Sequence, residues 1–339
     1  MQNIGKKCSN LLKLEKLMVN VPNFILLTKE ELNKFSGNWT KEEKEFLKYL
    51  VESKFNAKYR ASIPKKFSVR SSGSISAPGR MDSVLNVTED SLTNAVNIVL
   101  SSIKSDKLHK YLDLKKVENF SYSIIIQEMV QGDATSNSCS GVLLTENPFD
   151  VNVGGIYVEF LPKSNGTELM SGKRTPETNL QDFNPHGFNS LIKQINKVSK
   201  LFSGNMEVEF VIEGKVAYIL QVREYSNVSS SISIINTDGL EMIGQGKTVM
   251  KLSCSGTVTN DKTNPSKDKI LVLPDTDWED TELLLNFGGV VTLNGGRLSH
   301  AASISREFSI PCVVGTSFKE TPKEGDKICF DTNGTIFKL

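Results

Sequence analysis

The sequence predicts a mixed α and β protein, of α+β or α/β class, that is built from more than one domain. Its 339 residues are more than one hydrophobic core usually encloses. Amphipathic stretches with helical spacing alternate along the chain with short apolar runs that are typical of strands. A segment rich in serine and asparagine, residues 224–237, precedes the C-terminal part of the chain and indicates a linker.

The composition argues against two classes of partner. Basic and acidic residues are balanced, 40 against 39, so we expect no nucleic-acid partner. No apolar run approaches the length of a membrane span, so we expect no membrane partner either. The five cysteines are scattered, odd in number and without a Cys-x-x-Cys pair, which favours reduced thiols in the cytoplasm over disulfides or a zinc site.

The N-terminal elements are predicted to be a helix, a strand and further helices. Residues 4–12 lead from a glycine and two lysines into an amphipathic helix, and residues 21–28 are typical of an extended strand. On its own, Lys7 at the start of this helix is typical of a solvent-exposed lysine. Residues 29–60 are amphipathic and rich in Glu and Lys, which predicts surface helices without chemistry.

The stretch over residues 68–87 carries the first chemical signal. We expect a strand to end at Val69, where Arg70 and a run of serines and glycines follow. Hydroxyls, exposed amides and a guanidinium are the donors that a triphosphate needs. A flexible Ser/Gly linker is the alternative, but linkers do not usually continue as Pro78-Gly79-x-Met81-Asp82. Arg80, inside this continuation, is a further candidate for a charge near the phosphates.

The middle of the chain is predicted to hold helices and then paired strands. Residues 90–104 are typical of a helix, and residues 123–130 form an apolar run that predicts a buried strand. On the residues alone, this run is equally typical of a core strand without a functional role. Residues 140–148 and 155–161 are expected to pair as a hairpin, with Gly172-Lys173-Arg174-Thr175-Pro176 following.

Two alternating strands, residues 207–213 and 218–223, are joined by the turn Gly214-Lys215. Alternation would place four polar side chains on one face, namely Glu207, Glu209, Gln221 and Arg223. Carboxylate and amide oxygens are the hard ligands that suit Mg²⁺, and a nearby arginine can stabilise charge on a transferring group. A hairpin at a sheet edge with polar residues outward is the alternative.

The C-terminal part is predicted to be one small domain that presents His300. Strands are expected at residues 269–273 and 289–293, a helix at residues 276–286 and a closing hairpin over residues 325–339. Gly295-Gly296 leads into Ser299-His300, after which small residues open a helix that runs to about Phe308. A helix start attracts anions because its first amides lack intrahelical partners.

A histidine in that position can attack phosphorus and then hold the phosphoryl product against those amides. The alternative is a buried histidine that caps its own helix. Of the three histidines in the chain, only His300 has this setting.

The motif from Gly295 to Arg306, followed by residues 310–316, resembles the phosphohistidine domain of the PEP-utilising dikinase family. That family includes pyruvate phosphate dikinase, PEP synthase and rifampicin phosphotransferase. The motif over residues 68–87 resembles the family's ATP-binding signature. The resemblance implies an ATP-grasp domain over residues 1–226, a linker over 227–242 and a small swivelling β/β/α phosphohistidine domain over 243–339.

The resemblance also implies ATP and Mg²⁺ as cofactors and a role for each of ten residues. His300 would carry the phosphoryl group, with Arg70 and Arg223 assisting catalysis. ATP would be bound by Lys7, Arg70, Gln127, Glu128, Val130, Glu209, Gln221 and Arg223. The metal ligands would be Glu209, Gln221 and Glu207. Leu298 stands where plant-type dikinases have a regulatory threonine, so that control is not expected.

The resemblance therefore implies an ATP-dependent phosphotransferase in which ATP phosphorylates or pyrophosphorylates His300 with release of AMP. His300 would then pass a phosphoryl group to a small-molecule acceptor, which stays open because no counterpart of the family's PEP/pyruvate barrel is seen. A phosphocarrier module that serves an acceptor site on a separate protein is a second hypothesis. A nucleotide-binding regulator without turnover is a third.

Overall fold

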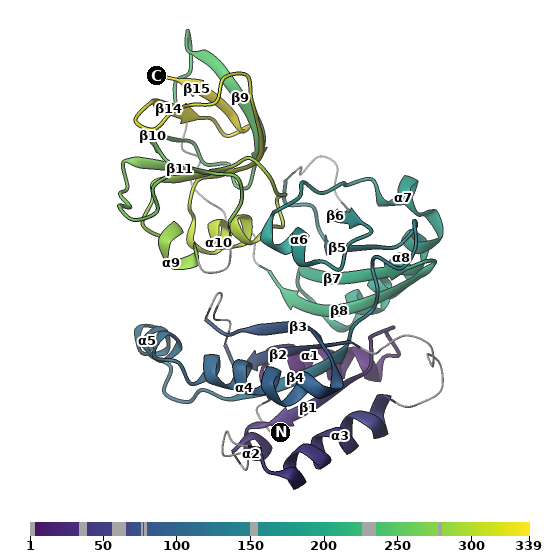
Figure 1. The fold of residues 1–339 in the computed structure, drawn as a ribbon. Helices are drawn as coiled ribbons and strands as arrows, with labels where there is room; N and C mark the ends of the chain where they lie inside the picture. The colour runs from purple at the N-terminus through teal and green to yellow at the C-terminus, as the bar shows by residue number, and fades with distance from the viewer. Residues whose placement is uncertain are drawn as a thin grey trace. The chain divides into compact units, whose positions relative to one another are not determined.

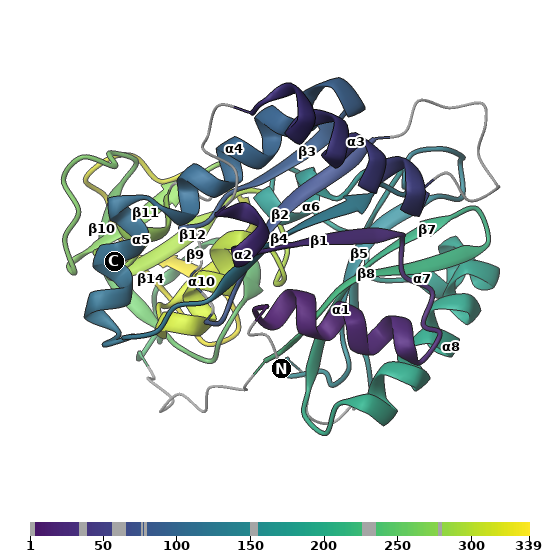
Figure 2. The same cartoon turned by 90° about the horizontal axis from the view of Figure 1, so that it is seen from below.

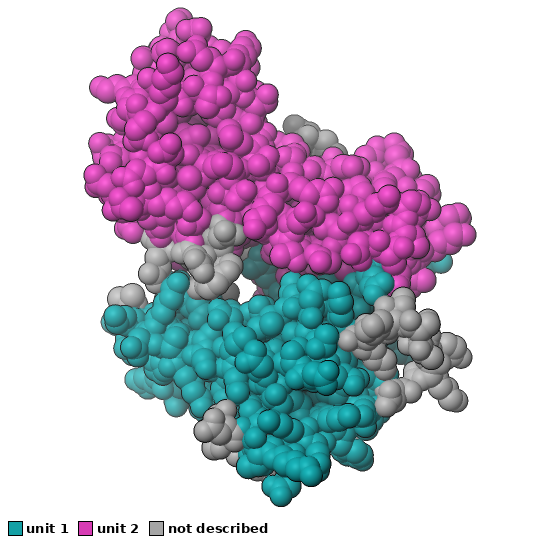
Figure 3. Space-filling view, viewed as in Figure 1, with its two compact units in different colours: residues 1–131, 191–203, 217–223 teal, residues 132–190, 204–216, 224–339 magenta. Residues whose placement is uncertain are grey.

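The computed structural model of the protein describes residues 4–33, 39–55, 66–75, 77, 80–149, 155–225, 235–276 and 280–339. The chain divides into two compact units, shown in different colours in Figure 3. Unit 1 comprises residues 1–131, 191–203 and 217–223, and unit 2 comprises residues 132–190, 204–216 and 224–339. Each unit is described by itself.

Unit 1 is organised around a four-stranded antiparallel sheet of order β1-β4-β2-β3. Its strands are β1 (Phe24–Thr28), β2 (Phe67–Gly73), β3 (Ser83–Val87) and β4 (Tyr122–Glu128). The central strand β4 pairs with β1 from Phe24↔Gln127 to Thr28↔Ser123, and with β2 from Phe67↔Glu128 to Gly73↔Tyr122. Its consecutive isoleucines are buried because both faces of this sheet are covered.

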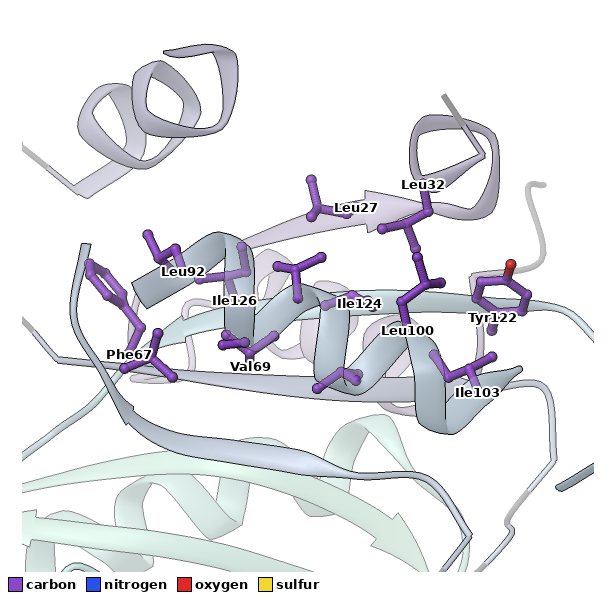
Figure 4. Packing of buried hydrophobic residues seen from close by; sticks show 14 of the residues in the cluster. Leu27, Leu32, Phe67, Val69, Leu92, Leu100, Ile103, Tyr122, Ile124 and Ile126 are labelled. Carbon is purple, nitrogen blue, oxygen red and sulfur yellow. The ribbon is translucent and has the colours of Figure 1, made fainter. Parts of the chain in front are cut away.

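The hydrophobic core of unit 1 lies on one face of this sheet, under α3 (Lys41–Phe55) and α4 (Leu92–Ile103) (Figures 2 and 4). Helix α4 buries residues at helical spacing: Leu92, Ala95, Val96, Val99, Leu100 and Ile103. They pack against Phe67 and Val69 of β2 and Ile124 and Ile126 of β4. Each fully buried Leu, Ile, Val or Phe contributes about 1.5–3 kcal/mol.

The opposite face of the sheet is covered by α1 (Lys6–Lys16). The backbone N–H of Cys8 donates to Ser72 Oγ at 3.1 Å, and Cys8 Sγ lies 2.8 Å from Ser123 Oγ. Gly5 precedes the helix with φ 81°, and a Cβ on it would lie 2.4 Å from the Ser72 carbonyl oxygen. Glycine is therefore required here both by conformation and by space.

The expectation that a strand ends at Val69 is wrong, because β2 continues to Gly73. Ladder pairing with β4 extends through Arg70↔Ile125 and Ser72↔Ser123, so the polar run is held by its neighbour strand rather than by its own propensity. Arg70 is therefore a strand residue. Pro78 and Gly79 of the same motif lie outside the described residues.

The remaining helices of unit 1 agree with the sequence where it is described. Helices α2 (Lys29–Leu32) and α3 fall in the predicted helical stretch 29–60, of which residues 34–38 and 56–60 lie outside the described residues. The 3₁₀ turn η1 (Glu89–Ser91), α4 and α5 (Asp106–Leu114) follow β3.

Unit 2 begins with the strands β5 (Cys139–Leu144), β6 (Tyr157–Pro162) and β7 (Met206–Glu213). The sheet order is β6-β5-β7-β8, where β8 spans Val216–Glu224. Strand β5 pairs antiparallel with β6 and with β7, which confirms the predicted hairpin of residues 140–148 and 155–161. The helices α6 (Thr167–Ser171) and α7 (Leu180–Phe183) belong to this part. Helix α8 (Pro185–Leu201) starts in unit 2 and belongs to unit 1 from Leu191 on.

The C-terminal part of unit 2 is a closed barrel of order β10-β11-β12-β13-β9-β15-β14 (Figure 1). Its strands are β9 (Glu241–Thr248), β10 (Cys254–Thr259), β11 (Lys269–Leu273), β12 (Gly289–Thr292), β13 (Cys312–Phe318), β14 (Lys327–Phe330) and β15 (Thr335–Lys338). The pairs β10–β11, β11–β12 and β12–β13 are parallel. The helices α9 (Thr281–Leu284) and α10 (His300–Phe308) lie between these strands in sequence.

Alternation along the parallel strands builds two cores. Ile270, Val291 and Val313 belong to the cluster that also takes residues from β9, β14 and β15. Their neighbours Leu271, Val290 and Val314 face the other way, into a cluster with residues of α9 and α10. Both faces are buried, so these strands are nearly continuous apolar runs. The helix α10 is thereby fixed to the outside of the barrel.

Two C-terminal expectations have different outcomes. The closing hairpin is confirmed by the antiparallel pair β14–β15. The helix predicted over residues 276–286 is wrong in extent, because the described part is α-helical only over Thr281–Leu284. Of the predicted linker, residues 227–234 lie outside the described residues, and the domain boundaries stay a prediction. In the described part of the chain, no helix is long and apolar enough to cross a membrane.

Candidate nucleotide and phosphohistidine sites

His300 is the first residue of α10, as the sequence predicted. Gly295 has φ 94°, and the Ser299 N–H donates to the Gly296 carbonyl at 3.1 Å, which closes a tight turn. Ser299 is extended, with φ −65° and ψ 169°, and its carbonyl accepts the Ser303 N–H at 2.9 Å. This geometry places the half-buried His300 among the first amides of the helix, where a negative charge is stabilised.

The two arginines around His300 are anchored. Arg297 Nε donates to the Thr248 carbonyl at 2.9 Å, and its guanidinium lies 4.6 Å above the Phe149 ring. Arg306 Nη1 donates to the Arg297 carbonyl, and Arg306 Nη2 donates to Ser303 Oγ at 3.2 Å. These two cations are therefore built into the loop before His300 and into the helix that it begins.

Glu159 of β6 is a residue that the sequence reasoning missed. Its side chain is fully buried, and its two carboxylate oxygens accept the backbone N–H groups of Arg297 and Leu298, each at 2.8 Å. The Tyr157 hydroxyl also donates to Glu159, at 2.8 Å. Because a buried carboxylate is costly unless it is hydrogen-bonded, these bonds fix the loop before His300 onto the β5–β6 sheet.

A signal for Glu159 is present in the sequence. It is the one charged residue in the otherwise apolar or aromatic run Ile156–Leu161. A charge inside a buried strand indicates a specific partner.

The glycines of the motif allow this close approach. A Cβ on Gly296 would lie 2.3 Å from Glu159 Oε2 and 2.4 Å from Pro176 Cγ. A Cβ on Gly295 would lie 3.2 Å from Gly172 Cα. The loop therefore meets the Gly172–Pro176 segment backbone to backbone, and Gly296 is required by space rather than by its φ angle.

Leu298 adds an apolar contact between the loop before His300 and the β5–β6 sheet. It is 1% exposed and packs with Val142, Leu144, Leu161 and Leu169. Leu298, which stands where plant-type dikinases have a regulatory threonine, is thus a buried side chain between the loop before His300 and the β5–β6 sheet.

The hydroxyl groups of two tyrosines near the β5–β6 sheet, Tyr157 and Tyr225, stay neutral. Burial raises the pKa of Tyr157 far above its ordinary value, and the neighbouring Glu159 raises it further. Burial also raises the pKa of Tyr225 to about 12, with Glu146 contributing in the same direction. Both hydroxyls therefore stay protonated and act as hydrogen-bond donors, Tyr157 to Glu159 and Tyr225 to the Glu146 carbonyl at 2.6 Å.

The two predicted metal ligands of unit 2 lie on one face of β7. Glu207 and Glu209 are two residues apart and pair with Leu144 and Val142 of β5. Glu207 is buried, 3% exposed, and its Oε2 lies 3.7 Å from Arg306 Nη2.

Two carboxylates are oxygen donors of the kind that suits Mg²⁺, and their assignment as metal ligands stays a prediction. Among the residues that the structure describes, no group of three or more His, Cys, Asp or Glu side chains is arranged to hold a metal ion. Mg²⁺ is usually held by one or two carboxylates and completes its shell with water and substrate phosphates.

Unit 1 brings several of the predicted ATP contacts to one face of its sheet. Arg70 and Gln127 lie on the face that α1 covers, because both alternate with the core residues Val69 and Ile126. Lys7 is in the first turn of α1 on that same side. These three donors come from three separate elements, which is how a polyphosphate is contacted from several directions.

Strand β8 contributes two more predicted residues to unit 1. The Gln127 amide donates to the Leu220 carbonyl at 3.5 Å, and the Asn10 amide donates to the Val222 carbonyl at 2.9 Å. Gln221 and Arg223 are two residues apart and so lie on one face of β8. The assignment of the metal set to Glu207, Glu209 and Gln221 draws on both units and stays a prediction.

Three further residues have defined contacts. Glu128 accepts from the Asn23 amide at 3.1 Å, and by alternation its side chain is on the opposite face from Gln127. Val130 follows β4 and is 7% exposed. The Arg80 guanidinium lies 4.6 Å above the Tyr111 ring, in contact with α5. The roles of Glu128 and Val130 in nucleotide binding stay predictions.

The fold and site thus define a class: a nucleotide-binding domain followed by a barrel that presents a histidine at a helix start. Models of known families match both parts. Residues 43–185 match the pyruvate phosphate dikinase AMP/ATP-binding domain, and residues 265–334 match the mobile domain of PEP-utilising enzymes. The chain belongs to the PEP-utilising dikinase family. The ATP-grasp and phosphohistidine domains are confirmed, as are ATP and Mg²⁺ as cofactors.

Curated relatives agree with this family. The chain is 27% identical over 280 residues to the pyruvate, phosphate dikinase of Rickettsia prowazekii, which covers 69% of this chain and 32% of the relative. It is 26% identical over 308 residues to the enzyme of Clostridium symbiosum, with 74% and 35% covered. The chain therefore spans about a third of the length of these relatives.

Solved structures show only distant likeness. D-alanine–D-alanine ligase from Helicobacter pylori matches with a TM-score of 0.35 and 14% identity, over 64% of this chain and 53% of that chain. The ADP complex of N5-carboxyaminoimidazole ribonucleotide synthetase matches with a TM-score of 0.38 and 11% identity, over 70% and 48%. Likenesses this low support no statement about function.

Proposed function

We propose that this protein is an ATP-dependent phosphotransferase of the dikinase type, with His300 as the phosphoryl carrier. The observation that carries this proposal is the position of His300 at the start of α10, in a domain that follows an ATP-binding domain of the same family. A neutral ring nitrogen of His300 attacks the β-phosphorus of ATP. The bond from that phosphorus to the bridging oxygen of the α-phosphate breaks, and AMP leaves with the electron pair.

The residues of the chain support this step in distinct ways. The first-turn amides of α10 stabilise the negative charge of the group received by His300. Lys7, Arg70 and Arg223 bind and orient the polyphosphate, and arginine forks suit phosphate oxygens. Glu207, Glu209 and Gln221 would hold Mg²⁺, which would neutralise phosphate charge when bound.

The acceptor is the part of the proposal that experiment must assign. The relatives are named for pyruvate and phosphate, so these two compounds are the first acceptors to test. Transfer to an acceptor site on a separate protein is the second candidate. We also propose a cytoplasmic location, which is supported by the five cysteines being free thiols.

The test is intact-protein mass after incubation with Mg·ATP, with AMP and ADP quantified. Because attack at the β-phosphorus carries the γ-phosphoryl group along, we expect an acid-labile pyrophosphoryl adduct, or a phosphoryl adduct once the γ-phosphoryl group has passed to water or phosphate. AMP is released in the wild type, and neither adduct nor AMP forms in His300→Ala. The loaded protein is then mixed with inorganic phosphate and pyruvate, separately and together, to see which removes the adduct. An unchanged mass and no nucleotide turnover would leave a nucleotide-binding regulator and refute the proposal.

A further inference from the structure

Two fully buried hydroxyl groups lie on paired strands of the unit 1 sheet, on Ser72 of β2 and on its ladder partner Ser123 of β4. A buried hydroxyl is costly unless it is hydrogen-bonded. Both hydroxyls donate to one acceptor, the Ile4 carbonyl just before α1, Ser72 at 3.1 Å and Ser123 at 2.5 Å. The two serines therefore hold the chain where it enters the helix.

The same two serines cap the start of α1. The N-cap residue Gly5 makes no side-chain cap, and the first N–H groups of a helix have no intrahelical partner. Ser72 Oγ accepts one of these groups, the Cys8 N–H, at 3.1 Å. Because the Ser123 hydroxyl donates to Ile4, the Cys8 thiol is the donor in its 2.8 Å contact with Ser123 Oγ. Strands β2 and β4 thus supply the cap that the helix does not make for itself.

These bonds lie on both sides of Lys7 in the chain, since Ile4 precedes it and Cys8 follows it directly. A lysine side chain is long and flexible, so the backbone that carries it decides where its ammonium can reach. Ser72 also lies two residues after Arg70, on the same face of β2. The strand that carries Arg70 therefore also fixes the helix start that carries Lys7.

We propose that Ser72 and Ser123 are positioning residues that hold the first turn of α1 on the sheet and so set Lys7 at the phosphates of ATP. This inference rests on the proposed function, in which Lys7 binds the polyphosphate. A group that is already held in its binding position loses less freedom when the ligand binds, which raises affinity. The serines act on the nucleotide only through the helix start, so their effect is confined to the phosphates that Lys7 contacts.

The experiment measures binding of Mg·AMP-PNP and, separately, of AMP by isothermal titration calorimetry. AMP-PNP carries the full triphosphate chain and AMP only its first phosphate, so the pair separates phosphate contacts from the rest of the nucleotide. The variants are Ser72→Ala, Ser123→Ala, Lys7→Met and the double variant of Ser72→Ala with Lys7→Met. Circular dichroism melting checks folding. If Ser72→Ala does not melt cooperatively, Ser123→Ala carries the test, because it leaves the bond from the Cys8 N–H in place.

Ser105→Ala is the matched control. Ser105 caps the start of α5 in the same unit, where its hydroxyl accepts the Leu108 N–H at 3.3 Å and donates to the Ser102 carbonyl at 2.7 Å. The control therefore removes the same kinds of bond from a helix start that carries none of the predicted ATP contacts.

We expect Ser72→Ala to weaken binding of Mg·AMP-PNP by about tenfold, which corresponds to about 1.4 kcal/mol, and binding of AMP by less than about threefold. Ser123→Ala removes fewer bonds to the helix start and should weaken Mg·AMP-PNP by about threefold, with AMP unchanged. In the Lys7→Met background, Ser72→Ala should add less than about twofold, because the side chain that it positions is gone. Ser105→Ala should bind both nucleotides as the wild type does.

Unchanged affinity of the serine variants for Mg·AMP-PNP would overturn the inference. So would equal losses for Mg·AMP-PNP and AMP, an undiminished effect in the Lys7→Met background, or an equal loss in Ser105→Ala, since each would indicate a merely structural role. A wild type that binds no Mg·AMP-PNP, or a Lys7→Met variant that binds it normally, would instead contradict the proposed function. The two failures are therefore distinguishable.

Discussion

Replacement of Glu159 by glutamine is the perturbation that tests the docking of the histidine loop most sharply. The wild-type carboxylate is fully buried and accepts one backbone N–H on each oxygen, from Arg297 and Leu298, at 2.8 Å. Glutamine has nearly the same shape but only one acceptor oxygen. Its NH₂ group must therefore face one of the two loop N–H groups, donor against donor.

The expected loss follows from these two bonds. A hydrogen bond to a charged group contributes about 1.5–3 kcal/mol. Glutamine loses one of the two bonds and weakens the other, so we expect the docked loop to lose about 3 kcal/mol, or about 150-fold in its docking equilibrium.

Hydrogen exchange of the Arg297 and Leu298 amides measures this directly, since local opening sets their protection. Both amides should exchange about 150-fold faster in Glu159→Gln. Tyr157→Phe is the matched control, because it leaves both loop amides bonded to Glu159. It removes the hydroxyl's bond to Glu159 and its contact with the Arg297 side chain. Unchanged protection in Glu159→Gln, or equal loss in both variants, would refute the reasoning.

Three further predictions concern the same unit. Gly296→Ala places a methyl 2.3 Å from Glu159 Oε2, so it should abolish the exchange protection of the Arg297 and Leu298 amides and the labelling of His300. Gly204→Ala, with nothing within 4 Å of its Cβ, should behave as wild type, and normal labelling of Gly296→Ala would contradict the prediction. Leu298→Ala, at a 1% exposed position, should weaken docking by about 2–5 kcal/mol, measured by the same exchange experiment, and retention of full protection would be the contrary result. Burial raises the pKa of the Cys254 thiol to about 11, so alkylation by iodoacetamide at pH 8 should be about 100-fold slower in the native than in the unfolded chain. The native rate, measured by peptide mapping, should rise about tenfold per pH unit, and equal native and unfolded rates at pH 8 would contradict this.

The histidine helix could be predicted from the sequence because its signals are local. A glycine pair, a serine before the first helical residue and small residues after it describe a turn and a helix start without reference to the rest of the chain. The structure accordingly begins α10 at His300 and ends it at Phe308. The apolar strands that precede and follow this helix in the chain were equally predictable, because burial on both faces of a strand leaves a continuous apolar run in the sequence.

The extent of β2 could not be predicted in the same way. Arg70, two serines and Gly73 have the local character of a loop, yet they form ladder pairs with β4. Pairing with a strand that lies more than fifty residues later in the chain overrides local propensity. The extent of α9 was missed for a related reason, since apolar residues after Leu284 pack as a turn rather than as a further helical turn.

Glu159 shows where prediction of the site reached its limit. The sequence displays a charge within an apolar strand, which indicates that the carboxylate has a partner. It does not say that the partners are two backbone amides in a loop 138 and 139 residues further along the chain. Residues that act through long-range docking carry no local motif, whereas residues that contact phosphate do.

The central claim is that His300 receives the β-phosphoryl group of ATP. The measurement that tests it most directly is incubation with Mg²⁺ and ATP labelled at the β-phosphorus, followed by peptide mapping at neutral pH and quantification of AMP. The account predicts acid-labile label on the peptide that contains His300, in proportion to AMP released, and no label in His300→Ala. Label that persists in His300→Ala, or AMP release without any labelled peptide, would contradict it.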